Sequence, residues 1–255
     1  MTIQLMDTHC HLDFPVFDER REQLLTDAEA SGVTKMVVAG VTAATWPRLL
    51  RCCEDKRLYP ALGLHPCFMH EHREAHLKML SDLLEQRSVV AVGEVGLDFF
   101  IPGADKAAQT HLFEAQLKLA QQFDLPVLLH VRKAHDEVLK QLRRYQLKRG
   151  GIVHAYSGSL QQAQQYLALG FKLGIGGTLT YERAKRLRRL VLELPLASFV
   201  LETDSPDMPL SGYQGEPNQP GRVRQIAEIF AQLKAMPLAG LARQTTSTAR
   251  ALLQL

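Results

Sequence analysis

Short aliphatic runs alternate along the chain with longer stretches in which apolar residues recur every three to four positions. Most of the short runs are apolar on both faces, as expected of buried parallel strands. They predict eight strands, at Ile3–Thr8, Lys35–Gly40, Tyr59–Leu64, Val89–Gly93, Pro126–His130, Gly151–His154, Phe171–Ile175 and Ser198–Glu202. The longer stretches predict amphipathic helices. These are Glu22–Ser31, a helix beginning at Trp46, His76–Gln86, Ala107–Phe123, His135–Tyr145, Leu160–Leu169, Arg183–Leu192, Arg224–Leu233 and Ala239–Leu253.

The order of these elements is eight repeats of a strand followed by a helix. Such units form right-handed crossovers between parallel strands. Eight of them in 255 residues predict an α/β fold, a single-domain (β/α)8 TIM barrel spanning residues 1–255. An open, doubly wound sheet is the alternative. The irregular, proline-rich stretch Pro206–Gly221 follows the eighth strand, where a barrel builds active-site loops.

Composition narrows the class of protein only modestly. Hydrophobic residues make up 46% and charged residues 22% of the chain, which excludes a disordered or fibrous protein. The net charge, 30 − 27 = +3, is too small to indicate nucleic acid or membrane by itself. Four cysteines fit no disulfide framework, and neither a signal peptide nor a membrane span is evident. We therefore expect a cytoplasmic protein with reduced thiols and no membrane contact.

Two histidines stand at the end of the first predicted strand, in the segment Asp7-Thr8-His9-Cys10-His11-Leu12-Asp13. Alternate residues of an extended chain point the same way, so His9 and His11 share a face. Two converging imidazoles form half of a metal site. The alternative is a pair of histidines in a polar turn.

Other strand ends carry the same kind of residue. His65, Glu94, His130, His154 and Asp204 all lie at or just after predicted strands. A barrel directs these ends to one mouth, so the side chains would surround a common point. Separate, individually satisfied polar groups are the alternative.

The set exceeds what one tetrahedral zinc requires, so we expect two divalent ions. Glu94 would bridge them, with His9, His11 and Asp204 on one metal and His130 and His154 on the other. Zn, Mn, Co or Ni suit such ligands, and Mg suits them less well.

Several motifs resemble those of the TatD family of metal-dependent hydrolases, which belongs to the amidohydrolase-type barrels. They are His9-Cys10-His11-Leu12-Asp13, Gly63-Leu64-His65-Pro66, Gly93-Glu94-Val95-Gly96-Leu97-Asp98, His130-Val131-Arg132 and Glu202-Thr203-Asp204-Ser205-Pro206. The resemblance extends from about Asp7 to Arg250 and is greatest to the YjjV-type bacterial branch. It implies a TIM barrel with a divalent-metal site, and DNase activity as in several members. It also implies that the six ligands above bind metal and that His65 and Arg132 contact the scissile phosphate.

Two segments depart from the family pattern. After His154 the chain reads Ala155-Tyr156-Ser157-Gly158 where the family usually has Cys-Phe-Ser-Gly. Asn218-Gln219-Pro220 stands where Asn-Glu-Pro is common. The lost carboxylate bears on substrate preference more than on the metals.

We expect hydrolysis of DNA phosphodiester bonds by a metal-activated water. Glu94 and Asp204 are the predicted catalytic carboxylates, and Asp204 would orient the water and accept its proton. The fork of Arg132 suits phosphate. We expect a monomer with DNA as substrate and no protein partner. Alternatives are a hydrolase of a small phosphoester, lactone or amide, since fold does not fix function, and a barrel that only binds. The intact ligand set argues against the last.

Several residues keep two interpretations. Arg132 could pair with Asp136 instead of phosphate, and His65 could cap the turn before Pro66. Asp98 could hold a metal-binding histidine or cap the next helix.

Other parts of the sequence also allow more than one interpretation. Ser157–Ser159 could bind phosphate or cap a helix. Trp46 is expected in the core or at its rim. Two basic clusters are expected to be solvated helix faces rather than nucleic-acid contacts, and they comprise Lys140, Arg143, Arg144, Lys148 and Arg149, and Arg183, Lys185, Arg186, Arg188 and Arg189.

Overall fold

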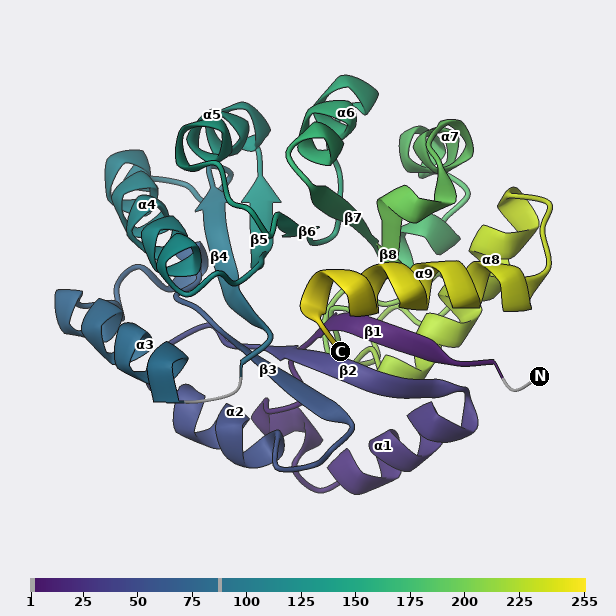
Figure 1. The fold of residues 1–255 in the computed structure, drawn as a ribbon. Coiled ribbons are helices and arrows are strands. Elements are labelled where there is room, and N and C mark those ends of the chain that lie inside the picture. Colours follow the sequence, from purple (N-terminus) through teal and green to yellow (C-terminus); the bar gives the residue numbers. More distant parts are fainter. Residues whose placement is uncertain (1–2, 87–88) are drawn as a thin grey trace.

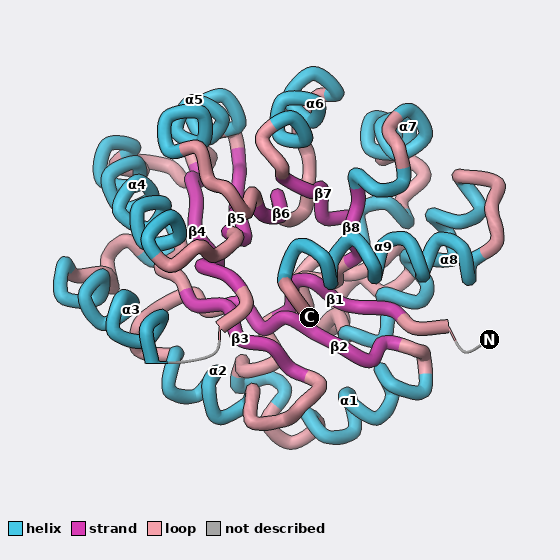
Figure 2. The backbone as a smooth tube through the Cα atoms, viewed as in Figure 1, coloured by secondary structure: helices cyan, strands magenta, loops and turns pink. Residues whose placement is uncertain are grey.

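A ring of eight parallel strands surrounded by helices forms the centre of the molecule (Figures 1 and 2). The computed structural model describes residues 3–86 and 89–255, so residues 1–2 and 87–88 of the expected domain lie outside the described residues. The strands follow one another in chain order, without the reversal of a doubly wound sheet. The predicted TIM barrel is confirmed. The strands are β1 (Leu5–Cys10), β2 (Val33–Ala39), β3 (Leu58–Leu62), β4 (Ala91–Asp98), β5 (Val127–Arg132), β6 (Gly151–Val153), β7 (Phe171–Ile175) and β8 (Phe199–Leu201).

A helix follows each strand, and a further helix ends the chain. The helices are α1 (Arg21–Ala30), α2 (Trp46–Cys52), α3 (Glu74–Gln86), α4 (Lys106–Gln122), α5 (His135–Tyr145), α6 (Leu160–Ala168), α7 (Lys185–Glu193), α8 (Val223–Leu233) and α9 (Leu238–Leu253). Their apolar faces pack on the outside of the barrel, as the helical periodicity predicts.

Strands β4 and β5 extend further than their apolar runs predict. β4 was expected to end at Gly93, but its ladder with β5 continues to Asp98, which pairs with Arg132. The pattern misses this extension because Glu94, Gly96 and Asp98 interrupt the apolar run, although the backbone groups of these residues pair regardless. Gly96 permits it: its φ is 147°, and a Cβ there would lie 2.0 Å from the carbonyl oxygen of His130.

The barrel closes between β1 and β8 through a short seam. Asp204 N–H donates to the carbonyl of His9 at 2.8 Å, and His11 N–H donates to that of Ser205 at 2.7 Å. Asp7 is fully buried there and accepts from the backbone N–H of Thr203 at 3.0 Å and from its hydroxyl at 2.5 Å. These bonds hold the ends of the first and last strands together.

Helix α9 covers the end of the barrel at which the strands begin. Its Ala249 and Leu253 join the inner apolar cluster, which includes Met6 and Ile152. The Thr246 hydroxyl donates to the carbonyl of Gln4, just before β1. The opposite mouth is therefore the open one.

Among the described residues, none of the helices is both long and apolar enough to span a membrane.

Candidate metal centre

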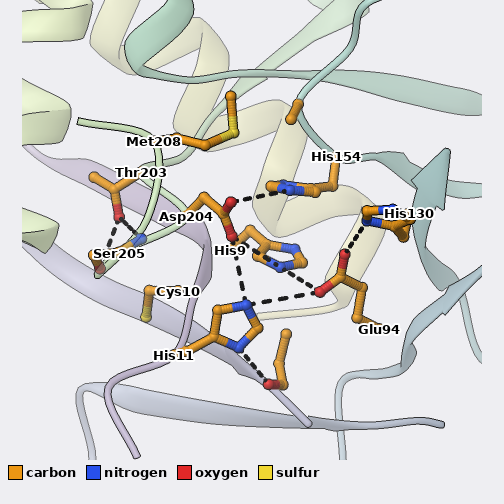
Figure 3. A network of polar contacts seen from close by, with 12 residues as sticks. His9, Cys10, His11, Glu94, His130, His154, Thr203, Asp204, Ser205 and Met208 are labelled. Atoms are coloured by element: carbon orange, nitrogen blue, oxygen red, sulfur yellow. Dashed lines mark hydrogen bonds and ion pairs between the residues drawn. The ribbon is translucent and has the colours of Figure 1, made fainter. Parts of the chain in front are cut away.

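The polar side chains predicted from the strand ends gather at the open mouth of the barrel (Figure 3). A pocket of about 580 Å³ lies there, and five of the six predicted ligands line it together with Phe14, Phe68 and Met208: His11, Glu94, His130, His154 and Asp204. The sixth, His9, is fully buried and contacts Glu94. The prediction that distant strand ends meet at one place is thus confirmed.

His9 and His11 project from the end of β1 toward the barrel axis. Nδ1 of His11 lies 2.9 Å from the carbonyl oxygen of Ala39, which can only accept, so this nitrogen carries the proton. Nε2 of His11 is thereby left facing the pocket. The imidazole of His9 stacks on that of His154, with ring centroids 3.8 Å apart.

Glu94 lies at the centre of the group (Figure 3). Its Oε2 is 3.1 Å from Nε2 of His9 and 3.7 Å from Nε2 of His11. Its Oε1 is 3.1 Å from Nδ1 of His130 and 3.2 Å from Nε2 of His65. One carboxylate therefore faces both sets of histidines, which is the arrangement that a bridging ligand needs.

His130 is oriented by Asp98, which lies behind it. Nε2 of His130 donates to Oδ2 of Asp98 at 3.0 Å, and Nδ1 points toward Glu94. Asp98 thus holds a predicted ligand, while Asp105 caps the following helix α4. The first of the two interpretations of Asp98 is confirmed.

His154 is held between two carboxylates. Its Nδ1 is 3.0 Å from Oε1 of Glu202, and its Nε2 is 3.5 Å from Oδ2 of Asp204. Glu202 is fully buried and also accepts from the backbone N–H of Ala155 at 2.6 Å. A Cβ at Gly174 would lie 2.1 Å from Oε2 of Glu202, so the glycine makes room for this carboxylate.

Asp204 follows β8 and completes the centre. Its backbone adopts a left-handed conformation with φ of 60°, which aspartate tolerates better than most residues. Its Oδ1 is 3.4 Å from Nε2 of His11 and 3.7 Å from Nε2 of His9. It thus lies beside both β1 histidines, as predicted.

The electrostatics of the centre favour ionised carboxylates. Burial opposes ionisation of Glu94, but His65 and His9 hold its pKa well below its usual range. The pKa of Asp204 is also lowered, against burial, by the imidazoles beside it. Burial likewise opposes protonation of His11, but Asp204 and Glu94 outweigh it and raise the His11 pKa to about 9. The pKa values of His130 and His154 are also raised, against burial, by neighbouring carboxylates, whereas burial lowers those of His9 and His65. Without a bound cation, protons on His11, His130 and His154 therefore balance the carboxylates.

This donor set fits divalent metal ions. The donor atoms of His9, His11 and Asp204 lie within 4.8 Å of one another, and so do those of His9, Glu94 and His154. Carboxylates buried this deeply require a compensating charge, and imidazole with carboxylate is the ligand chemistry of zinc and its neighbours. A bound cation would take the place of the protons on the imidazoles.

His65 caps a turn and also faces the pocket. Its Nδ1 accepts from the backbone N–H of Cys67 at 3.1 Å, which caps the turn at Pro66–Phe68. Its Nε2 nevertheless points at Glu94, inside the pocket.

Arg132 also lines the pocket, and its guanidinium lies 4.0 Å from the ring centroid of Phe100. The expected alternative partner, Asp136, instead accepts from Gln162 at 2.8 Å. In the described part of the chain Arg132 has no ion pair, which leaves its fork free for an anion.

Of the two segments that depart from the family pattern, the one after His154 reaches the pocket, and Asn218-Gln219-Pro220 lies in the loop after β8. Tyr156 lines the pocket, and its hydroxyl donates to the carbonyl of Ser159 at 2.6 Å. Asn218 is buried and donates to the carbonyls of Thr203 at 2.9 Å and Met208 at 3.2 Å. Asn218 thus ties the loop to the end of β8, and Gln219 does not line the pocket.

The structure also places Ser159 and Trp46. Ser159 caps α6 in a capping box with Gln162, so this helix end is satisfied by its own side chains. Trp46 is fully buried and donates to the carbonyl of Gly63 at 3.2 Å, as a core residue.

The sequence interpretation assigned no role to Glu202 and left that of Asp98 open. Glu202 is two residues before Asp204, and Asp98 is four residues after Glu94, at the end of β4. The available signal was their place in Glu202-Thr203-Asp204 and Gly96-Leu97-Asp98. Their partners depend on which strands are adjacent, which the motif itself does not contain.

Comparison with known proteins gives a consistent result. A family model described as TatD related DNase matches residues 6–254. The metal-dependent hydrolase YjjV of Escherichia coli (strain K12) is 45% identical, covering 93% of each chain. The crystal structure of YJJV from the same organism matches with a TM-score of 0.97 and 43% identity over 100% of both chains. A protein of Erwinia billingiae (strain Eb661) named 3'-5' ssDNA/RNA exonuclease TatD is 30% identical over 98% of this chain and 99% of its own.

Proposed function

The chain belongs to the TatD-related DNase family of metal-dependent hydrolases, and from that premise we propose that it hydrolyses phosphodiester bonds of DNA. The observation that carries the proposal is the placement of Glu94. It faces both histidine sets and also His65, which lies beside Arg132 in one pocket. Ligands for cations and groups for a phosphate anion therefore share a single cavity.

The centre would hold two divalent ions, one on His9, His11 and Asp204 and the other on His130 and His154. Glu94 would bind both ions, and Zn, Mn, Co and Ni suit the set better than Mg. When bound, such ions lower the pKa of water and neutralise charge on phosphoryl oxygens.

The chain's own side chains supply the positioning. Arg132 can form a two-pronged contact with a phosphate, and its fork has no ion pair in the described residues. Nε2 of His65 can donate a hydrogen bond to another phosphate oxygen. Asp204 is ionised at neutral pH and lies at the pocket wall, so it can orient the attacking water and hold the proton that the water loses.

A polymeric nucleic acid substrate is supported by the family description and by the name of the Erwinia billingiae relative. DNA is the proposed substrate, and the protein is proposed to act as a monomer in the cytoplasm. No protein partner is invoked.

A comparison of substrate classes tests this function. The Mn-reconstituted protein is given bis(p-nitrophenyl) phosphate, p-nitrophenyl acetate, a simple lactone, and labelled DNA and RNA. We expect hydrolysis of the phosphodiester and of DNA, with the carboxyl ester and lactone much slower. Rapid lactone or ester hydrolysis with intact DNA would contradict the proposal.

A further inference from the structure

A second hollow, of about 750 Å³, adjoins the metal pocket. We call it the side groove. Arg132 and Ser157 line both cavities, so the two adjoin at these residues. The side groove then runs between the start of α5 and residues 157–159, toward Arg186 of α7. A chain whose phosphate lies at the metals could therefore continue into it.

One wall of the side groove is an exposed aromatic ring. Phe100 is 53% exposed, although most large apolar residues of the protein are buried. One face of its ring lies against the guanidinium of Arg132, with 4.0 Å between the charged carbon and the ring centroid. A flat apolar surface beside a phosphate-binding pocket is what a nucleobase requires for stacking.

Unpaired cations line the side groove around this ring. Arg186 donates to the carbonyl of Ser157, which directs its guanidinium over the groove. Lys133, the residue after Arg132, also lines the groove. Among the described residues neither Arg186 nor Lys133 has an ion pair, whereas Arg189, one turn along α7, pairs with Glu193 at 2.5 Å.

The acidic groups of the side groove are already engaged. Asp136 accepts from Gln162 at 2.8 Å, and Glu137 pairs with Lys140 at 3.1 Å. Gln162 is neutral, so Asp136 keeps its negative charge, but the three cations Arg132, Lys133 and Arg186 outnumber it and the groove is net positive. Arg186 is exposed, as expected of the second basic cluster, and it also lines the side groove.

We propose that the side groove binds the nucleotide next to the scissile phosphate, with its base on Phe100 and its outer phosphate between Arg186 and Lys133. This subsite rests on the proposed function. It requires an unpaired base, because a base within a duplex has no free face for the ring. It also makes the protein prefer oligonucleotides over small phosphodiesters, which end at the metal pocket.

Binding of a fluorescein-labelled, single-stranded oligothymidylate tests the subsite without requiring turnover. We expect Phe100→Leu to raise the Kd about tenfold, since one base stack is lost. Phe100→Trp should retain the affinity. Arg186→Ala should weaken binding and lower the salt dependence by about one phosphate contact. Arg189→Ala, on the same helix but outside the groove, is the matched control and should bind like the wild type.

Hydrolysis of bis(p-nitrophenyl) phosphate is the second readout. If Phe100 serves the subsite, Phe100→Leu and Arg186→Ala leave kcat/KM for this small diester within about twofold, since its phosphate lies in the metal pocket. An unchanged Kd for the oligonucleotide, or equal losses on both substrates, would overturn the subsite. If the wild type hydrolyses neither substrate but its oligonucleotide binding depends on Phe100 and Arg186, the subsite stands and the proposed phosphodiesterase function fails.

Discussion

Individual side chains of the metal centre are fixed by a second partner on the side away from the metals. Asp98 holds His130, Glu202 lies against His154, and the carbonyl of Ala39 holds His11. Such contacts choose which imidazole nitrogen faces the metal and restrict the ring to one orientation. The precision of the centre therefore depends on residues that do not bind metal.

Replacing Asp98 tests this dependence. Asp98→Asn removes the acceptor for Nε2 of His130 while keeping an oxygen for the Phe100 N–H, so we expect metal affinity to fall about 10- to 100-fold. Competition with a chromogenic chelator measures it. Asp105→Asn, at the cap of α4, is the control and should leave metal affinity unchanged. Equal affinities for the two variants would show that Asp98 does not orient His130.

Replacing Gly174 tests the space reserved for Glu202. The new methyl group of Gly174→Ala would overlap Oε2 of Glu202. We expect a loss of about 1–3 kcal/mol in the free energy of unfolding, together with weaker metal binding through His154.

Urea unfolding of the Gly174→Ala protein gives the first quantity and chelator competition gives the second. Gly240→Ala in α9 is the control, because its Cβ would meet only the end of Met236 at 3.4 Å. It should be neutral or stabilising by up to about 1 kcal/mol. A stable Gly174→Ala protein with normal metal binding would show that Glu202 has room to move.

Residue identity at the strand ends was enough to predict which side chains meet at the mouth of the barrel, but it missed Glu202 and left the role of Asp98 open. Histidines and carboxylates in those positions are conspicuous in the sequence because such groups are costly to bury without partners. Glu202 and Asp98 have the same chemistry, and only the packing of neighbouring strands distinguishes a ligand from its support.

At the scale of elements, the seam between β1 and β8 both closes the barrel and positions ligands of the metal centre. Asp7 of β1 accepts both bonds from Thr203 after β8, and the same seam presents His9, His11 and Asp204 to the pocket. Closure of the barrel and assembly of the metal centre thus share one set of contacts. Sequence periodicity predicted the strands themselves, but it ended β4 and β5 too early because Glu94, Asp98 and Arg132 interrupt their apolar runs.

Weakening the seam should therefore cost stability. Thr203→Val removes the hydroxyl that donates to Asp7, and a buried polar group deprived of a partner costs about 1–3 kcal/mol. Urea unfolding checks this value. Thr246→Val removes the exposed bond to Gln4 and should cost about 0.5 kcal/mol or less. The account of the seam fails if the two variants have equal stability.

For the whole molecule, the inner apolar cluster and the polar metal centre lie at opposite ends of the barrel. Helix α9 and the inner apolar cluster close one end of the barrel, while the other end holds the buried histidines and carboxylates. The alternation of strands and helices predicted this fold because each unit has a single way to pack on the last. The side groove was not predicted, since Phe100, Arg132 and Arg186 come from three separate segments.

Bound metal should stabilise the whole molecule. Ions that bind only the folded chain add about 2.7 kcal/mol at a free concentration one hundred times their Kd. Thermal unfolding with Zn or Mn, against the same protein in a chelator, should show a clear rise in Tm. Glu94→Gln should reduce that rise. An identical Tm in metal and in chelator would mean that the centre does not bind these ions.

The central claim, that Glu94 and the groups around it form a metal centre that cleaves DNA, is tested most directly by cleavage of end-labelled DNA. Wild type and Glu94→Gln, both shown to be folded, are incubated with the same substrate in Mn and in chelator. We predict products only from the wild type with metal, at a rate at least about a hundredfold above that of the variant, because loss of the bridge costs about 2.7 kcal/mol or more. Cleavage that survives in Glu94→Gln or in chelator, or metal-loaded wild type that leaves the DNA intact, would contradict the claim.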